Sequence, residues 1–459
     1  MPERLPNGQL ESALPIGPQA AAASAGNTLD PYADRYAART RGMSVSEIRA
    51  LFAVANRPEI VSLAGGMPYT AALPIDSVAA MVGELLLNNG PKALQYGPGQ
   101  GDERLRELIC EVMALEGITG SAEDVTVTIG SQQALDLVSR TFLDPGDVVL
   151  AEGPSYVGAL GTFEAAQAEV VHVPMDGDGL IPQALRDALI RLTAEGRRAK
   201  FLYTVPNYHN PAGVTLSEER RPQILAICAE FDLLVLEDNP YGLLGFDGVT
   251  HPALRSLAPE RVIYLGSFSK TFSAGVRVGW ALAPPAVRQK LVLLSEAEVL
   301  CPPNLTQFVV AEYLATQPWR EQIKVFRELY RERRDAMLTA LTAQMPAECS
   351  WTVPTGGFYV WLTLPDGLDS KVMQPRAIHS RVAYVPGVGF FADGNGRRDM
   401  RLSYCFPEPD RIREGVRRLA GVVEEELELR ETFMSGATSA SPAAVGGRHG
   451  SDAPGPEVA

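Results

Sequence analysis

Short apolar runs alternate with amphipathic stretches through the middle of the chain. Between about residues 75 and 300, runs such as 201–205 and 233–237 consist of branched and aromatic residues, and a helical pattern at 216–231 separates them. Runs of this kind are typical of strands buried on both faces, and a helix between two of them indicates a parallel βαβ unit. The pattern therefore predicts an α/β fold with a central, mostly parallel sheet flanked by helices.

The pattern changes after about residue 300. A long amphipathic stretch at 304–343 is followed by three shorter apolar segments, at 356–362, 383–386 and 401–404. A charged helix then continues to about Arg430. Short strands among helices are typical of a smaller α+β domain, which we expect to follow the large one.

Both ends of the chain are rich in Pro, Ala, Gly and Ser. Such a composition buries too little apolar area to offset the entropy of the chain, so we expect disordered tails. The predicted organisation is a tail at 1–30, an N-terminal segment at 31–74 that packs with the small domain, a large domain at 75–303, a small domain at 304–432 and a tail at 433–459.

Composition and charge narrow the class of protein. The 459 residues are 46% hydrophobic and 21% charged, which is typical of a soluble protein with a large core. The net charge of -14, from 41 basic and 55 acidic residues, repels nucleic acid and anionic membranes. We therefore expect neither as a partner.

Location and metal content follow from the rarer residues. No run of eighteen apolar residues occurs, and the first residues lack the core of a signal peptide. The five cysteines are scattered without a Cys-x-x-Cys pair, which favours reduced thiols in a cytoplasmic protein. The few histidines have no metal-ligand spacing, so we expect no metal site.

Candidate chemistry centres on Lys270, which lies between Ser269 and Thr271 directly after the apolar strand 261–266. Ligands of open α/β sheets bind at the carboxyl ends of strands. A lysine held there away from water loses affinity for its proton and becomes a nucleophile toward aldehydes. The alternative is an ordinary solvated loop lysine.

Donors for a phosphate lie near this lysine. Ser267, Ser269 and Arg277 are residues that bind a phosphate dianion. A strand from Asp124 breaks at Gly130 into a helical pattern, which places Ser131 and Gln132 at a helix start where free N–H groups bind phosphate. A plain capped helix explains that segment equally well. An aldehyde that carries a phosphate describes pyridoxal 5'-phosphate.

Three further side chains suit that cofactor. Asp238 ends the apolar strand 233–237, and a carboxylate paired with the pyridine nitrogen keeps the nitrogen protonated. Asn210 follows the strand 201–205, and Asn210 and Tyr241 are placed to donate to the phenolic oxygen. The ordinary alternatives are an N-cap aspartate and an Asn-Pro turn.

In this order and spacing, Asn210, Asp238, Tyr241, Lys270 and Arg277 resemble the fold-type-I pyridoxal-phosphate aminotransferases of class I/II. The resemblance extends from about Ser44 to about Leu427. The segments 62–68 and 94–101 are similar to the branch with 2-aminoadipate and kynurenine aminotransferases. Two segments depart from the pattern, 67–74 and 301–305, and both concern substrate specificity more than reaction type.

The resemblance implies roles for further residues. Tyr96 should reach the phosphate of the neighbouring subunit in a homodimer with shared active sites, and Tyr156 should stack on the pyridine ring. Arg401 should bind the substrate α-carboxylate, beside Gly66 and Asn210. A guanidinium forks onto a carboxylate through two parallel bonds, although a surface ion pair is the ordinary role of such an arginine.

Arg49 lies in the helical segment ahead of the Ala-Gly-Gly sequence, where the resemblance implies a receptor for a distal substrate carboxylate. Acidic donors such as glutamate or 2-aminoadipate would then be substrates. The alternative is a solvated helix arginine.

The resemblance implies an aminotransferase that moves the amino group of an L-amino acid to a 2-oxo acid, with 2-oxoglutarate as the natural acceptor, in a ping-pong cycle. Lys270, Asp238 and Tyr241 are then the catalytic residues. One alternative is a β-lyase or decarboxylase on the same fold, because fold does not determine reaction. Another is a catalytically silent cofactor sensor related to transcription factors, although only about forty mostly low-complexity residues precede the matched region.

Overall fold

The computed structural model describes residues 30, 32, 35–41 and 57–439. The chain divides into two units, residues 1–43 and residues 44–459. The first unit contains the short helix α2 (Ala38–Arg41). Arg49 lies outside the described residues. The elements below belong to the second unit.

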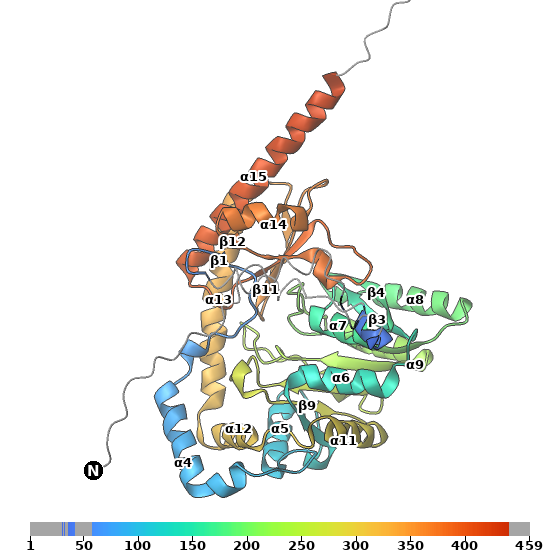
Figure 1. The fold of residues 1–459 in the computed structure, drawn as a ribbon, viewed down its shortest axis with the longest axis vertical. Coiled ribbons are helices and arrows are strands. Elements are labelled where there is room, and N and C mark those ends of the chain that lie inside the picture. Colours follow the sequence, from blue (N-terminus) through green and yellow to red (C-terminus); the bar gives the residue numbers. More distant parts are fainter. Residues whose placement is uncertain (1–29, 31, 33–34, 42–56, 440–459) are drawn as a thin grey trace, which may run out of the picture. The chain divides into compact units, whose positions relative to one another are not determined.

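The large sheet of this unit has eight strands in the order β2-β9-β8-β7-β6-β3-β4-β5. The strands are β2 (Val125–Thr128), β3 (Val148–Gly153), β4 (Glu169–Asp176), β5 (Gly179–Leu180), β6 (Ala199–Thr204), β7 (Leu234–Asp238), β8 (Val262–Ser267) and β9 (Gly279–Leu282). Strands β4, β3, β6, β7 and β8 are parallel, whereas β9 is antiparallel to both of its neighbours. The expected α/β fold with a mostly parallel sheet is confirmed (Figure 1).

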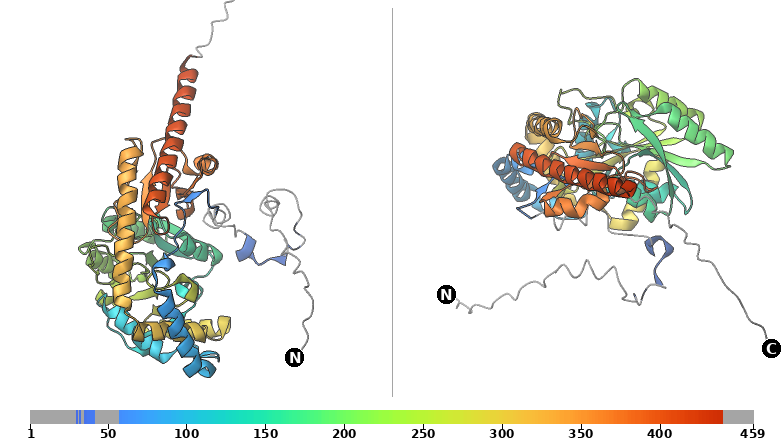
Figure 2. Two further views of the ribbon diagram at one scale, coloured as in Figure 1. Left: turned by 90° about the vertical axis from the view of Figure 1, so that its left-hand side faces the viewer. Right: turned by 90° about the horizontal axis from the view of Figure 1, so that it is seen from above.

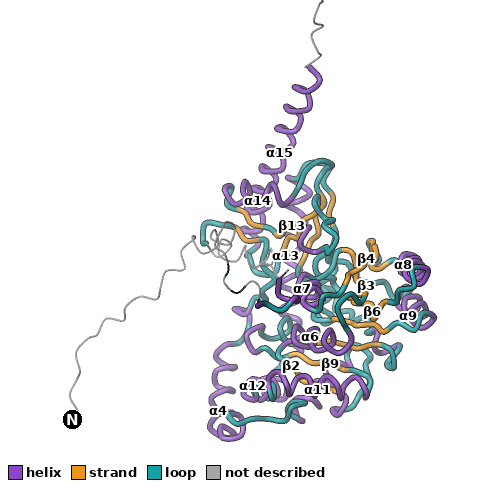
Figure 3. The backbone as a smooth tube through the Cα atoms, turned by 45° about the vertical axis from the view of Figure 1, so that its right-hand side comes forward, coloured by secondary structure: helices purple, strands orange, loops and turns teal. Residues whose placement is uncertain are grey.

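Successive residues of the central strands enter two different cores. On one face, Val149 and Tyr203 pack with α6 (Gly130–Phe142) and α7 (Val157–Ala165). On the other face, Leu150 and Leu202 pack with α8 (Pro182–Ala194) and α9 (Arg220–Glu230), which Figure 3 shows beside β3, β4 and β6. Each buried side chain of this size contributes about 1.5–3 kcal/mol. Burial on both faces explains why these strands are apolar throughout.

The remaining helices of this part of the chain surround the sheet at one end. They are α4 (Ile75–Ala93), α5 (Glu103–Ala114), α10 (Leu254–Leu257), α11 (Pro285–Val299) and α12 (Asn304–Thr316), and α12 packs against α4 and α5. Short 3-10 turns occur at Thr70–Ala72, Ala122–Asp124, Ala274–Val276 and Gly387–Phe390.

The amphipathic stretch at 304–343 forms two helices, α12 and α13 (Trp319–Gln344). Pro318 lies between them, and proline lacks the N–H that a continuous helix needs while its ring clashes with the preceding turn. The amphipathic pattern continues across the break because both helices pack on apolar neighbours.

A smaller antiparallel sheet has the order β10-β11-β14-β13. Its strands are β10 (Ser350–Trp351), β11 (Tyr359–Thr363), β13 (Val385–Pro386) and β14 (Asp399–Ser403), with α14 (Ser370–His379) nearby in the sequence. Helices α13 and α15 (Pro409–Ser439) pack side by side, as Figure 2 shows. The short strand β1 (Val61–Ser62) pairs in parallel with β12 (Val382–Ala383).

Helix α15 continues past Arg430, where the sequence pattern placed its end. The first proline after Pro409 is Pro442, so no backbone restriction ends the helix earlier. Across the described ranges, none of the helices has the length and apolar character that crossing a membrane requires.

Candidate active site

A cavity of about 320 Å³ lies at the carboxyl ends of β6, β7 and β8. Parallel strands direct these ends to one edge of the sheet, where ligands of α/β proteins bind. The cavity brings together most of the residues that the sequence singled out: Gly66, Ser131, Gln132, Tyr156, Asn210, Asp238, Tyr241, Ser267, Ser269, Lys270, Arg277 and Arg401. Met67, Val205, Pro240, Ala274 and Tyr359 complete the lining.

The Lys270 amine faces this cavity three residues beyond the end of β8. Its Nζ donates a hydrogen bond to the Gly66 carbonyl oxygen at 2.8 Å. Burial lowers the pKa of Lys270 to about 8, and the cations Arg401 and Arg277 act in the same direction. A large share of the amine is therefore unprotonated in mildly alkaline solution, as a nucleophile or base requires.

Asp238 has one oxygen bonded and one free. Its Oδ2 accepts a hydrogen bond from the Tyr203 hydroxyl at 3.0 Å, whereas the buried Oδ1 has no partner among the described residues. Burial raises the pKa of this carboxyl to about 6. A buried acceptor without a partner costs about 1–3 kcal/mol, so the free oxygen suits a protonated ring nitrogen of a ligand in the cavity.

An anion cradle lies at the start of α6. Arg277 donates from its guanidinium to the Ile129 carbonyl at 3.2 Å and to the Ser269 hydroxyl at 3.5 Å, and Ser267 donates to Ser269 at 2.8 Å. The backbone N–H groups at the start of this helix point to the same place.

Glycines allow the close approach in this cradle. Gly130 has a φ of +71°, and a Cβ there would lie 2.3 Å from the Arg277 guanidinium. A Cβ on Gly279 would lie 2.5 Å from the Ser131 backbone nitrogen. Any side chain at these positions would displace the donors, so the cradle depends on both glycines.

Gln132 and Tyr156 support one another on the next wall. The Gln132 amide donates to the Thr162 hydroxyl at 2.8 Å, and the Tyr156 hydroxyl donates to the Gln132 oxygen at 3.4 Å. The Gln132 side chain is thus engaged with α7, and its backbone N–H is the group left for an anion. Burial raises the pKa of Tyr156 to about 12, so its ring is neutral.

Arg401 is held rigidly at the opposite side of the cavity. Its guanidinium donates to Asn210 Oδ1 at 2.9 Å and to the Ala64 carbonyl at 2.8 Å. The guanidinium also lies between the rings of Tyr359, at 4.2 Å, and Phe390, at 5.1 Å. Its Nε has no partner among the described residues. A cation fixed in this way is prepared to bind a carboxylate.

Gly66 lies where no side chain fits. A Cβ there would approach the Tyr359 hydroxyl to 2.1 Å. The ring of Tyr241 meets that of Tyr359 edge to face with centroids 6.1 Å apart. Burial keeps the pKa of Tyr241 well above 10, so its hydroxyl remains a donor.

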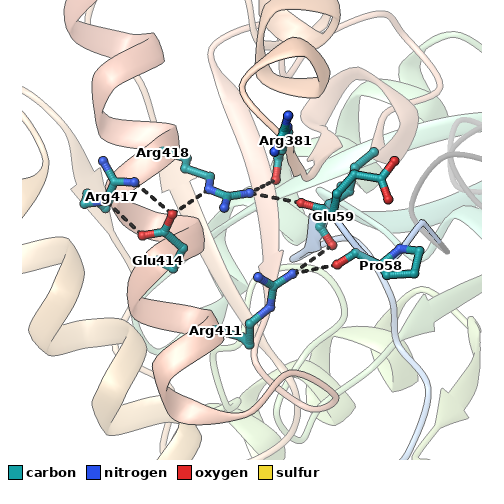
Figure 4. Close-up of polar contacts among 8 residues, drawn as sticks. Pro58, Glu59, Arg381, Arg411, Glu414, Arg417 and Arg418 are labelled. Carbon is teal, nitrogen blue, oxygen red and sulfur yellow. Dashed lines mark hydrogen bonds and ion pairs between the residues drawn. The ribbon is translucent and has the colours of Figure 1, made fainter.

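Helix α15 anchors the backbone that leads to Gly66. Arg411 donates to the Pro58 carbonyl and Arg418 to the Glu59 carbonyl, each at 3.1 Å. Glu414 accepts from Arg418 at 2.8 Å and orients it (Figure 4). These bonds fix the segment before β1, which continues to the carbonyls that hold Arg401 and Lys270.

Among the described residues, one predicted site residue, Tyr96, does not line the cavity. Tyr96 is 76% exposed, and Arg49 lies outside the described residues. The roles of Tyr203 and Tyr359 could not be predicted, because a tyrosine in an apolar strand gives no signal beyond core packing.

A buried pair, Glu152 and His209, was not predicted either; its Nε2 and Oε2 lie 3.0 Å apart. Glu152 accepts hydrogen bonds from the Thr204 hydroxyl at 2.7 Å and the Val205 N–H at 2.8 Å. The Ala212 N–H donates to His209 Nδ1 at 3.2 Å. The pair therefore connects the end of β3 to the loop that carries Asn210.

Comparisons with known proteins agree with this geometry. The family model for aminotransferases of class I and II matches residues 58–419. Aromatic-amino-acid aminotransferase 1 of Thermococcus litoralis is 39% identical over 402 residues, which cover 87% of this chain and 96% of that protein.

Two solved structures are similar along most of the chain. The kynurenine aminotransferase of Pyrococcus horikoshii, solved with PMP, has a TM-score of 0.83 and 38% identity, and the match covers 87% of this chain and 99% of that one. The alpha-aminoadipate aminotransferase of Thermus thermophilus, complexed with N-(5'-phosphopyridoxyl)-L-leucine, has a TM-score of 0.81, 38% identity and the same two coverages.

Proposed function

The chain belongs to the class I and II aminotransferases, and from that premise we propose which residues carry its activity and which substrates it takes. The predicted reaction, amino-group transfer with pyridoxal 5'-phosphate on a type-I fold, is confirmed by the family and its relatives. The roles of individual residues rest on the cavity described above.

The cavity has a matching group for each part of the cofactor. Lys270 offers an amine to the aldehyde, and the free Oδ1 of Asp238 offers an acceptor to the ring nitrogen. The phosphate fits the cradle of Ser269, Arg277 and the start of α6. The main support for the proposal is that Lys270, whose pKa is lowered, and the unpaired buried oxygen of Asp238 line the same cavity.

Pyridoxal 5'-phosphate supplies an aldehyde for amine exchange and a ring that accepts electrons. Asp238 would hold the proton of the ring nitrogen, Tyr156 would lie against the ring, and Asn210 and Tyr241 would donate to the phenolic oxygen. Asn210 is suited to this because its Oδ1 is engaged by Arg401, which leaves its amide nitrogen as the donor.

Two residues act on the substrate itself. Arg401 binds the α-carboxylate and fixes the orientation of the substrate Cα, beside Gly66 and Asn210. The Lys270 amine then removes the proton from that Cα as a general base. In the reverse half reaction the same amine gives a proton back to the Cα. With a pKa of about 8, the amine changes protonation state in mildly alkaline solution.

The donor is an aromatic or acidic L-amino acid, and the acceptor is 2-oxoglutarate. The names of the relatives support the class of donor, since they refer to aromatic amino acids, kynurenine and alpha-aminoadipate. The role of Arg49 toward a distal carboxylate stays a prediction.

The assembly is a cytoplasmic homodimer in which Tyr96 reaches the phosphate of the neighbouring subunit. The exposure of Tyr96 supports this role. The proposed large domain is 75–303, and the proposed small domain begins at 304 and includes α15, which ends at Ser439 rather than at 432.

Replacement of Lys270 tests the assignment. Lys270→Ala should bind the cofactor without turnover, whereas Lys290→Ala, at an exposed helix position, should match wild type. Cofactor uptake is measured by visible absorbance, and turnover with a panel of amino acids and 2-oxoglutarate. Normal transamination by Lys270→Ala would refute the role of Lys270, and release of pyruvate and ammonia without acceptor would indicate a lyase.

A further inference from the structure

Tyr203 lies behind the cavity and contacts Asp238 from the far side. It belongs to β6, is fully buried, and packs edge to face on Phe163 with ring centroids 5.6 Å apart. In the parallel pairing of β6 with β7, Tyr203 lies opposite Leu236, so Asp238 two residues later projects from the same face. The register therefore brings the hydroxyl to the carboxylate.

The two oxygens of Asp238 have separate environments. The Tyr203 hydroxyl donates to Oδ2 at 3.0 Å, while Oδ1 is buried without a partner among the described residues and Asp238 lines the cavity. Tyr203 itself is not among the residues that line the cavity. Its hydroxyl makes one hydrogen bond within the described part of the chain, the bond to Asp238.

We propose that Tyr203 is a positioning residue that keeps Asp238 anionic and aimed at the cavity, so that the cofactor's ring nitrogen, rather than the carboxylate, holds the shared proton. The inference rests on the proposed function, in which Asp238 pairs with that nitrogen. Packing of this core does not require a hydroxyl, because Phe163 and Phe201 fill the same core and carry none.

The electrostatic surroundings make this bond important. Burial raises the pKa of Asp238, whereas the hydrogen bond from Tyr203 and the charge of Lys270 lower it. Tyr156 is the other titratable group close to Asp238, and it is neutral because burial raises its pKa. Tyr203 stays a donor, since burial and Asp238 raise its own pKa well above 10. Loss of the hydroxyl therefore moves the proton toward the carboxylate.

The chain offers a matched control. Tyr264 of β8 is also buried and donates to a buried carboxylate, Glu116 Oε2, at 2.7 Å. Neither Tyr264 nor Glu116 lines the cavity. Tyr264→Phe thus removes the same kind of bond from the same sheet and leaves the hydrogen bond to Asp238 in place.

The experiment compares Tyr203→Phe, Tyr264→Phe and wild type, each loaded with pyridoxal phosphate labelled with ¹⁵N in the ring. In Tyr203→Phe we expect the ¹⁵N shift of the ring nitrogen to move toward the unprotonated value, because more of the shared proton then lies on Asp238, and we expect kcat to fall about tenfold, as when a charged hydrogen bond is lost. KM for the amino acid should change little, because Arg401 is untouched. Tyr264→Phe should match wild type in the nitrogen signal.

Incorporation of 3-fluorotyrosine at position 203 gives a second test that preserves the fold. A fluorinated phenol is a stronger donor, so the ¹⁵N shift of the ring nitrogen should move further toward the protonated value. A ¹⁵N shift unchanged from wild type in both position-203 variants would overturn the inference while leaving the proposed function intact. Wild-type protein that takes up no cofactor would refute the proposed function itself, and the inference with it.

Discussion

A buried carboxyl behind the site predicts an unusual dependence of stability on pH. Glu116 follows α5, and its two oxygens accept hydrogen bonds from the Asn239 amide at 2.6 Å and the Tyr264 hydroxyl at 2.7 Å. Burial raises its pKa from 4.5 to about 7, and the nearby Glu237 adds to the effect. The folded protein therefore holds this proton more tightly than the unfolded chain does.

The sign and size follow from linkage. Between pH 4.5 and about 7 unfolding releases the proton of Glu116, so this group makes stability fall as pH rises through that window. The difference between the folded and unfolded pKa values of Glu116 corresponds to about 3 kcal/mol of lost stability. The full loss is present above pH 7. Below pH 4.5 both states are protonated and the effect vanishes.

Glu116→Gln removes the titration but keeps the shape. The glutamine accepts from Asn239 and donates to the Tyr264 oxygen. In urea unfolding across about pH 5 to 8, the variant should gain up to about 3 kcal/mol over wild type as pH rises. Other titrating groups, Glu237 included, are common to both proteins and largely cancel in the difference.

Glu111→Gln, at an exposed position of α5, is the control and should give a difference that does not change with pH. The same flat difference for Glu116→Gln would refute the reasoning, because it would mean that the folded and unfolded states bind this proton equally.

Two further predictions concern the cavity. Arg401→Lys loses the planar fork toward the carboxylate, so kcat/KM for an amino acid should fall roughly 100- to 1000-fold. The slow reaction of the matching amine, which has no carboxylate, should stay unchanged. Equal losses for both compounds would contradict the assigned role. Gly279→Ala places a Cβ 2.5 Å from the Ser131 nitrogen, so cofactor affinity, measured by absorbance titration, should drop at least tenfold. Gly161→Ala in α7 meets no atom within 4 Å and should bind normally, and equal affinity of the two variants would exclude the cradle.

Much of the site could be predicted because of how parallel sheets are built. Asp238 and Lys270 come directly after apolar strands, and the carboxyl ends of neighbouring parallel strands lie together. Side chains 32 positions apart in the sequence therefore had to meet at one edge, whatever the details of packing.

Other contacts had no signal in the chain. The bond from Tyr203 to Asp238 depends on the register of β6 against β7, and Tyr359 reaches Arg401 through the pairing of β11 with β14.

The sequence alone determined the fold class, the order of the elements and the kinds of reactive group at the strand ends, because hydrophobic periodicity and strand direction are local properties. Only the tertiary structure decided which buried polar groups pair, as in the Glu116 cluster and the Glu152–His209 pair. Those pairings depend on distances between segments far apart in the chain. Such distances are set by packing of the whole core and not by any one segment.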